Sequence, residues 1–253
     1  MKRFPAEINL FFNALVFFTR IPAPKGVVFS ESNQNLASRY FPLIGLLIGS
    51  VCAFIYLVSS HIFPSSIALL LSMATSLLLT GAFHEDGLAD SADGFGGGWT
   101  KKQILQIMKD SRIGTYGTVT VITALALKYN ALAAIAQPAL IMVLGHSLSR
   151  LAAVFLIYKD QYVRDDDQAK AKPLANSIDL RSLGIAALPP IAVLLMMDLT
   201  AWLVLAPVAL TVVLCSRYFN QRIGGYTGDC LGACQQLSEL TIYLFFCIPL
   251  FLD

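Results

Sequence analysis

The sequence predicts an all-α membrane protein, a polytopic bundle of about seven transmembrane helices (six to eight) with a short interfacial helix at its amino terminus. Of the 253 residues, 56% are hydrophobic and 13% are charged, whereas a typical soluble domain is about 25% charged. The mean hydropathy of +0.66 is high. The apolar segments are continuous and do not alternate with polar residues, which favours membrane-spanning helices over a β-barrel.

Seven stretches are apolar enough to span a bilayer, for which a helix needs about 20 residues. They are residues 41–63, 65–83, 115–136, 138–158, 183–197, 199–215 and 240–252, the last of which can begin as early as Leu237. Residues 8–19 are apolar but short and lack a signal-peptide cleavage site, so we expect an interfacial or re-entrant helix there. The whole chain, 1–253, is predicted to be one integral membrane domain.

Sixteen of the eighteen Lys and Arg residues lie in four segments, which are residues 1–40, 84–114, 159–182 and 216–236. With seven spans, all four segments fall on one side of the membrane, and the turns on the opposite side carry no Lys or Arg. The positive-inside rule makes the charged side cytoplasmic and predicts a protein of the cytoplasmic (inner) membrane. The net charge of +2 gives no reason to expect a nucleic-acid partner. The lipid bilayer is the predicted partner, and association into a homo-oligomer is left open.

The densest charge in the chain follows the second span, where four carboxylates occur within nine residues: Glu85, Asp86, Asp90 and Asp93. In a helix, Asp86, Asp90 and Asp93 would share one face. A hard divalent cation offsets the repulsion on such a face, and Mg²⁺ is often bound by a few carboxylates together with substrate phosphates. The simpler alternative is a solvated acidic loop. We expect the segment 84–114 to be a cytoplasmic catalytic loop with Mg²⁺ as its cofactor.

Three further elements suit a phosphate-bearing ligand. Lys109, Asp110 and Arg112 follow the acidic cassette and suit a diphosphate, although Lys and Arg are also common at membrane boundaries. Arg150 lies inside a predicted span, where ionisable residues are costly and usually functional. A glycine-rich segment before the last span either holds an anion on its backbone N–H groups or packs helices. Its candidate binding residues are Gly224, Gly225, Thr227 and Asp229.

The chain resembles the cobalamin synthase family, the adenosylcobinamide-GDP ribazoletransferases, in five motifs that follow one another through nearly the whole sequence. They are T-R-I-P (19–22), R-Y-F-P-L-I-G (39–45), H-E-D-G-L-A-D-x-x-D-G-F (84–95), K-D-S-R-I-G-T-Y-G (109–117) and G-G-Y-T-G-D-C-L-G-A (224–233). The resemblance implies a Mg²⁺-dependent membrane transferase of late cobalamin biosynthesis. It would join adenosylcobinamide-GDP to α-ribazole, or to its 5′-phosphate, giving adenosylcobalamin, or its 5′-phosphate, and GMP.

For this chemistry we expect specific roles for the candidate residues. The expected metal ligands are Glu85, Asp86 and Asp90, with Asp110 either a further ligand or the partner of Lys109 and Arg112. Asp93 is the expected general base, and Asp90, Lys109 and Arg112 are the other expected catalytic residues. Arg150 and the segment 224–232, with Asp229, are expected to bind substrate.

Two other functions compete with this interpretation. A CDP-alcohol phosphatidyltransferase acting on lipid carries a related acidic motif, D-G-x-x-A-R, but here Asp86-Gly87 is followed by Leu88-Ala89-Asp90. A cation transporter would bind its cargo at the acidic cluster. Transporter sites lie near the membrane midplane and often in repeated halves, whereas this cluster follows a span and no repeat is visible.

Overall fold

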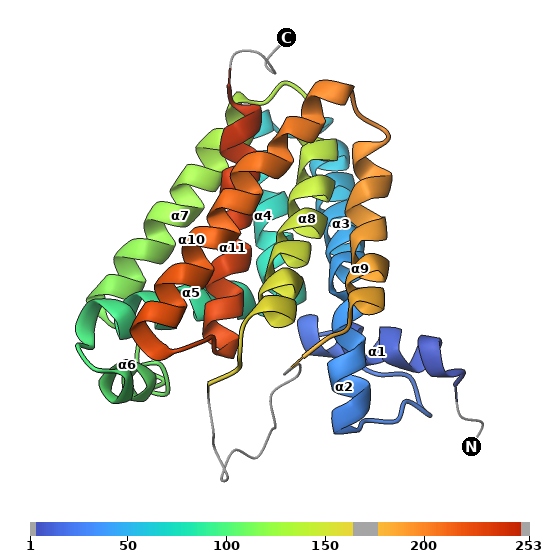
Figure 1. Cartoon of the computed structure of the whole chain (residues 1–253). Coiled ribbons are helices and arrows are strands. Elements are labelled where there is room, and N and C mark those ends of the chain that lie inside the picture. The colour runs from blue at the N-terminus through green and yellow to red at the C-terminus, as the bar shows by residue number, and fades with distance from the viewer. Residues whose placement is uncertain (1–3, 164–176, 249–253) are drawn as a thin grey trace.

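Long helices form a bundle, and shorter helices gather at one end of it (Figure 1). The computed structural model describes residues 4–163 and 177–248. Its helices are α1 (Ala6–Phe18), α2 (Glu31–Ala37), α3 (Phe41–Ser60), α4 (Ser65–Thr80), α5 (Phe83–Gly97), α6 (Lys101–Ile107), α7 (Thr115–Ala134), α8 (Pro138–Lys159), α9 (Leu180–Leu194), α10 (Leu205–Ile223) and α11 (Gly228–Phe246). Two 3₁₀ turns, η1 (Ser38–Tyr40) and η2 (Leu199–Val204), precede α3 and α10. The all-α polytopic membrane bundle is confirmed.

Helix α8 lies in the middle of the bundle and packs most extensively against α3 and α11. Its contact with α3 depends on Gly45 and Gly49, because a Cβ at either position would collide with the backbone of α8. Hydrophobic attraction between helices is weak in lipid, so close van der Waals packing at small residues is a main source of stability. The α3–α8 pair is therefore held together by backbone contact that larger residues would prevent.

Within residues 4–163 and 177–248, four helical segments can cross a membrane by length and composition: Ser32–Ser60, Thr115–Ala134, Pro138–Lys159 and Leu199–Ile223. A fifth is counted if Ser65–Thr80 and Phe83–Gly97 form one span, although they are bent by 84°. Each of the seven predicted spans corresponds to one helix, and these helices are α3, α4, α7, α8, α9, α10 and α11. However, α4 and α9 have only 16 and 15 residues, and α11 carries Gln235, Gln236 and Glu239. Length and composition alone therefore support fewer than seven spans.

Several predicted boundaries were wrong. The last helix begins at Gly228 and not near residue 240, because the Thr227 hydroxyl caps it by accepting a hydrogen bond from the Cys230 N–H (3.3 Å). The sixth span begins as the η2 turn, and α10 continues to Ile223, beyond the expected end at residue 215. The segment 84–114, expected to be a loop, contains α5 and α6. Much of the predicted loop 159–182 lies outside the described residues.

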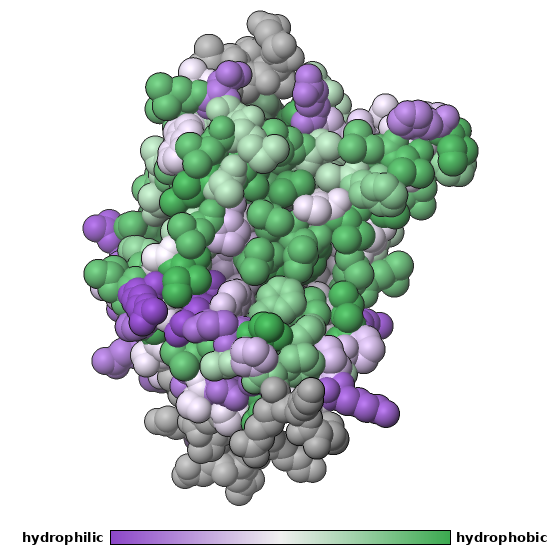
Figure 2. All heavy atoms as spheres, turned by 90° about the vertical axis from the view of Figure 1, so that its right-hand side faces the viewer, coloured by the Kyte–Doolittle hydropathy of each residue, from purple (hydrophilic) through white to green (hydrophobic). Residues whose placement is uncertain are grey.

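The described parts of the segments rich in Lys and Arg lie together at one end of the bundle. In Figure 1, α1, α2, α6 and the α10–α11 turn lie at the lower end, and the turns α3–α4, α7–α8 and α9–η2 lie at the upper end. This is the sidedness that the charge pattern predicts. Helix α1 covers the predicted interfacial segment 8–19 and lies across the lower end. Between the ends, hydrophobic residues dominate the face shown in Figure 2, and large side chains such as Phe54, Leu78 and Leu210 are exposed, as expected of a lipid-facing surface.

The close packing of α3 on α8 predicts opposite effects for two glycine substitutions. Gly45→Ala should destabilise the protein by about 1–3 kcal/mol, because the new methyl group meets the His146 carbonyl. Gly184→Ala on α9 meets nothing within 4 Å and should be neutral or stabilising by up to about 1 kcal/mol, because glycine is costly within a helix. Thermal unfolding in detergent measures both, and equal effects would contradict the packing.

Candidate active site

The acidic cassette lies on a helix that turns sharply away from the span before it. Helix α4 ends at Gly81, whose φ is +67°, and Ala82 follows with a φ of +57°. Both angles lie in the left-handed region, which suits glycine but strains alanine. The two helices meet at 84°. As a result, α5 does not continue in the direction of α4 and crosses the bundle near its charged end (Figure 1).

The four carboxylates of α5 have different surroundings, and Glu85 lies on another face of the helix from Asp86 and Asp90. Asp86 is exposed and Asp90 is partly exposed, one turn apart on the outward face. Glu85 and Asp93 are only 9% and 7% exposed. Successive residues of a helix are rotated by about 100°, so Glu85 and Asp86 cannot share a face. The predicted ligand set of Glu85, Asp86 and Asp90 is therefore not assembled by α5.

Asp93 is bound to the beginning of α7. Its two carboxylate oxygens accept hydrogen bonds from the backbone N–H groups of Gly114 (2.7 Å) and Gly117 (2.9 Å). A Cβ on either glycine would collide with the Asp93 carboxylate. A carboxylate at a helix amino terminus satisfies otherwise unpaired N–H groups and interacts favourably with the helix dipole. Asp93 thus caps α7, which leaves it poorly placed for its predicted role as a general base.

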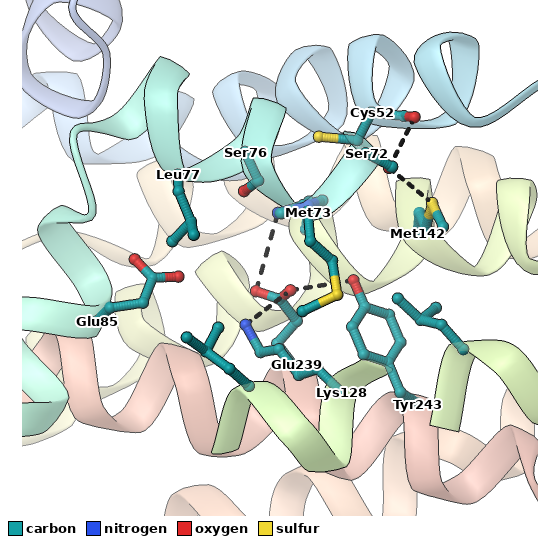
Figure 3. A pocket seen from close by; sticks show the side chains of 13 residues that line it. Cys52, Ser72, Met73, Ser76, Leu77, Glu85, Lys128, Met142, Glu239 and Tyr243 are labelled. Carbon is teal, nitrogen blue, oxygen red and sulfur yellow. Dashed lines mark hydrogen bonds and ion pairs between the residues drawn. The ribbon is translucent and has the colours of Figure 1, made fainter. Parts of the chain in front are cut away.

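Glu85 points into the bundle and not toward the outward face (Figure 3). Its Oε1 accepts a hydrogen bond from the Gln236 side chain (3.0 Å), and its Oε2 is buried without a partner. The carboxylate lines a small interior cavity of ≈ 30 Å³, whose other lining residues include Lys128, His146 and Glu239. Such a volume holds one or two water molecules. The predicted metal ligand Glu85 is thus a link between α5 and α11.

The interior around this cavity carries several further charged and polar groups. The Glu239 carboxylate lies 3.1 Å from the Lys128 ammonium and accepts hydrogen bonds from Gln235 (2.6 Å) and Tyr243 (3.0 Å). Arg150, predicted to bind a ligand, is 2% exposed, and its Nη1 donates to the His146 carbonyl (2.8 Å). In this arrangement Arg150 cannot contact a substrate at the surface.

The second basic element lies beside α5. A Cβ on Gly94 of α5 would collide with Met108, which precedes this element. Lys109 is exposed, and the Arg112 side chain is 86% exposed. The Arg112 Nη2 lies 2.6 Å from the Asp110 carboxylate, which also accepts a bond from Nε (3.0 Å). These hydrogen bonds lower the pKa of Asp110 to about 2. Asp110 is thus occupied by Arg112, and the exposed cations remain suited to a phosphate ligand.

The glycine-rich segment has a structural role at three of its four candidate positions. Gly224 ends α10 with a φ of +82°, and Gly225 has a φ of +155° and no room for a Cβ beside the Gln161 carbonyl. This allows Tyr226 to pair with the chain after α8. The Tyr226 N–H donates to the Gln161 carbonyl (2.9 Å), and the Tyr226 carbonyl accepts from the Val163 N–H (3.0 Å). Thr227 is the cap of α11. These residues thus end α10, cap α11 and hold the chain after α8, and the predicted binding role of the segment stays a prediction.

The fourth candidate, Asp229, lies beside the cassette. A Cβ on Gly87 of α5 would lie 3.0 Å from the Asp229 carbonyl oxygen, so the two backbones are in contact there. Asp229 is partly exposed. The fold therefore brings the first turn of α11 against the acidic helix, although the two are more than 130 residues apart.

Sequence reasoning missed two groups of residues that hold α5 in place. Arg222 donates hydrogen bonds to the carbonyls of Gly98 (2.8 Å) and Phe95 (3.2 Å) at the end of α5, and its guanidinium lies over the Phe95 ring. Gln235, Gln236 and Glu239 form the interior polar face of α11. A signal for this face was present, because these polar residues come just before a long apolar run. Nothing in the local sequence around Arg222 pointed to the end of α5.

The outward carboxylates fit a metal ion that is shared with a substrate. Among residues 4–163 and 177–248, no group of three or more His, Cys, Asp and Glu side chains is arranged to hold a metal. Asp86 and Asp90 supply two carboxylates one turn apart. Mg²⁺ is commonly bound by one or two carboxylates together with substrate phosphates, so these two residues suit a site that the substrate completes.

Comparison with known proteins identifies the family. A family model described as cobalamin-5-phosphate synthase matches residues 10–247. The adenosylcobinamide-GDP ribazoletransferase of Shewanella frigidimarina is 49% identical over 94% of both chains. A protein of the same name from Shewanella pealeana is 47% identical over 96% of both chains. Another, from Vibrio parahaemolyticus, is 45% identical over 94% of this chain and 91% of its own. No solved structure matches. With a family model and relatives that both cover nearly its whole length, the chain belongs to the cobalamin-5-phosphate synthase family.

Proposed function

We propose that this chain joins adenosylcobinamide-GDP to α-ribazole, or to its 5′-phosphate, and releases GMP in a Mg²⁺-dependent reaction. The observation that carries the proposal is the family match over residues 10–247, which includes the acidic helix and the glycine-rich segment. Family membership speaks against the lipid phosphatidyltransferase and the cation transporter considered from the sequence. By the positive-inside rule, the charged end of the bundle faces the cytoplasm, and the membrane is the inner membrane.

The proposed reaction breaks and forms bonds at one phosphorus atom. A ribose hydroxyl of α-ribazole attacks the phosphorus on the cobinamide side of the diphosphate, and the bond to the GMP phosphate breaks. The hydroxyl proton passes to a base, and GMP leaves with the bonding electron pair. Transfers of this kind depend mainly on positioning and on neutralising charge on the phosphates.

The exposed residues at the charged end suit these needs. Asp86 and Asp90 would hold Mg²⁺, which supplies charge neutralisation on the diphosphate when it is bound. Lys109 and Arg112 would bind the diphosphate oxygens by charge-assisted hydrogen bonds. Because both oxygens of Asp93 are bound to α7, we propose the partly exposed Asp229 as the acceptor of the hydroxyl proton.

The different directions of the α5 carboxylates predict different responses to Mg²⁺. Asp86→Asn and Asp90→Asn should lower GMP release by about 100-fold or more and raise the Mg²⁺ concentration needed for half-maximal rate. Glu85→Gln keeps an acceptor for Gln236 and should leave the Mg²⁺ requirement unchanged. GMP release from adenosylcobinamide-GDP and α-ribazole by membranes measures all three. An equal shift in Glu85→Gln would place Glu85 among the metal ligands, and no GMP release from the unaltered protein would overturn the proposed function.

Substitution of Asp93 tests whether this residue caps α7 or acts as the general base of the reaction. Asp93→Asn removes the charge and one acceptor at the start of α7, and should cost about 1–2 kcal/mol of stability. Activity should then fall in step with the melting temperature and recover when the assay temperature is lowered. Asp229→Asn, by contrast, keeps an oxygen acceptor for the Thr227 hydroxyl (3.4 Å) and should reduce the rate far more than its small effect on the melting temperature explains. A large rate loss in Asp93→Asn at an unchanged melting temperature would restore Asp93 as the base.

A further inference from the structure

A second cavity lies between α1 and α2 at the charged end of the bundle, and none of the residues proposed for the transfer reaction lines it. Its volume is ≈ 300 Å³, at the lower end of the range found for small-molecule sites. Apolar side chains such as Leu10, Val28 and Leu36 form much of its wall, and Glu7, Asn33 and Arg39 add polar groups.

The wall of this cavity is held in place by asparagine side chains. The Val28 N–H donates to the Asn9 side chain (2.7 Å). The Val28 carbonyl accepts hydrogen bonds from the amides of Asn9 (2.9 Å), Asn13 (3.2 Å) and Asn33 (3.1 Å). Four hydrogen bonds at one residue fix the loop before α2 against α1, so the cavity is formed before any ligand binds.

Arg39 supplies an unused donor in this wall. The residue is 9% exposed, and its Nε has no hydrogen-bond partner. Its Nη1 donates to Glu7 over 3.3 Å. The Asp179 carboxylate interacts electrostatically with Arg39 but accepts the Ser182 N–H as the cap of α9 (2.9 Å). A buried N–H without an acceptor is costly, and the guanidinium fork matches the oxygens of a phosphate.

Glu7 gives the same cavity an opposite charge. Its side chain is 60% exposed, and one oxygen accepts a hydrogen bond from the Tyr40 hydroxyl (2.7 Å). A cation and a carboxylate in one cavity match a ligand that carries both a phosphate and an ammonium group. Next to the lining residues, Ile8 and Phe29 are 45% and 52% exposed, so the cavity opens beside an apolar surface suited to a bilayer.

We propose that this cavity binds the phosphoethanolamine headgroup of a membrane phospholipid, with the phosphate at Arg39 and the ammonium at Glu7. The acyl chains would extend out of the cavity into the bilayer, along the exposed apolar residues of α1 and of the loop that follows it. Binding would hold α1 on the membrane surface. The proposal rests on this cavity alone and does not depend on the transferase reaction.

Native mass spectrometry of the full chain in detergent, titrated with single lipids, tests the proposal. One molecule of phosphatidylethanolamine should bind about tenfold more tightly than phosphatidylcholine, whose ammonium has no N–H to donate. Arg39→Gln should weaken this binding about tenfold, and Arg39→Lys, which lacks the Nε donor, should not fully restore it. Glu7→Gln should remove the preference for phosphatidylethanolamine and favour the anionic phosphatidylglycerol. Arg181→Gln, which alters another exposed arginine at the same end, is the matched control and should change nothing.

Three results would overturn the proposal. Equal affinity for the ethanolamine and choline lipids would show that Glu7 does not select an ammonium group. Displacement of the lipid by inorganic phosphate or by α-ribazole 5′-phosphate would show that the cavity takes a free phosphate or a substrate. An equal loss of binding in Arg181→Gln would show a general charge effect. Melting temperatures of the variants identify any that fail to fold. Glu7→Gln, which keeps an oxygen acceptor for Tyr40 and Arg39, then carries the test.

Discussion

The ion pair between Glu239 and Lys128 is the interaction on which the arrangement of the bundle depends. Both side chains are buried between helices, where an unpaired charge is strongly destabilising. Glu239 must therefore meet Lys128 of α7 (3.1 Å) and His146 of α8 (3.8 Å). Its neighbours Gln235 and Gln236 must meet Ser149 and Glu85. These contacts allow one rotation of α11 and one docking position for α5. A bundle of purely apolar helices would have many similar packings, and this polar face selects one of them.

Close backbone contacts and helix caps then hold the acidic helix in that position. Gly87 and Gly232 let α5 lie directly on the first turns of α11. Asp93 binds the beginning of α7, and Arg222 from α10 binds the carbonyls at the end of α5. The carboxyl-terminal half of this crossing helix is thus tied to α7 and α10, and the Glu85–Gln236 hydrogen bond ties its beginning to α11. Asp86 and Asp90 consequently lie on the exposed side of a helix that its neighbours hold in place.

The few charges of this chain serve three distinct purposes. Those in the interior, such as Glu239 and Lys128, specify the packing. Those on the outward face of α5 and in the following segment suit a phosphate-bearing substrate and Mg²⁺. Arg39 and Glu7 belong to a separate cavity beside α1. One acidic motif contributes to the first two groups, because Glu85 points inward while Asp86 and Asp90 point outward. Neighbouring carboxylates of one motif thus have different surroundings.

The sequence by itself determined the membrane class, the positions of most helices, the common side of the basic segments and the resemblance to the family. These follow from local hydrophobicity, from charge counts and from contiguous motifs, all of which can be read over short windows. It did not determine the direction of each carboxylate, the start of α11 at Gly228, or the roles of Asp93 and Arg222. The start of α11 follows from a local cap, the Thr227 hydroxyl. Only the tertiary structure decided the directions of the carboxylates and the roles of Asp93 and Arg222, because these depend on the 84° bend at Gly81–Ala82 or on partners at distant positions. The role of a buried polar side chain depends on which group forms its hydrogen bond, and the packing of the helices decides which group that is.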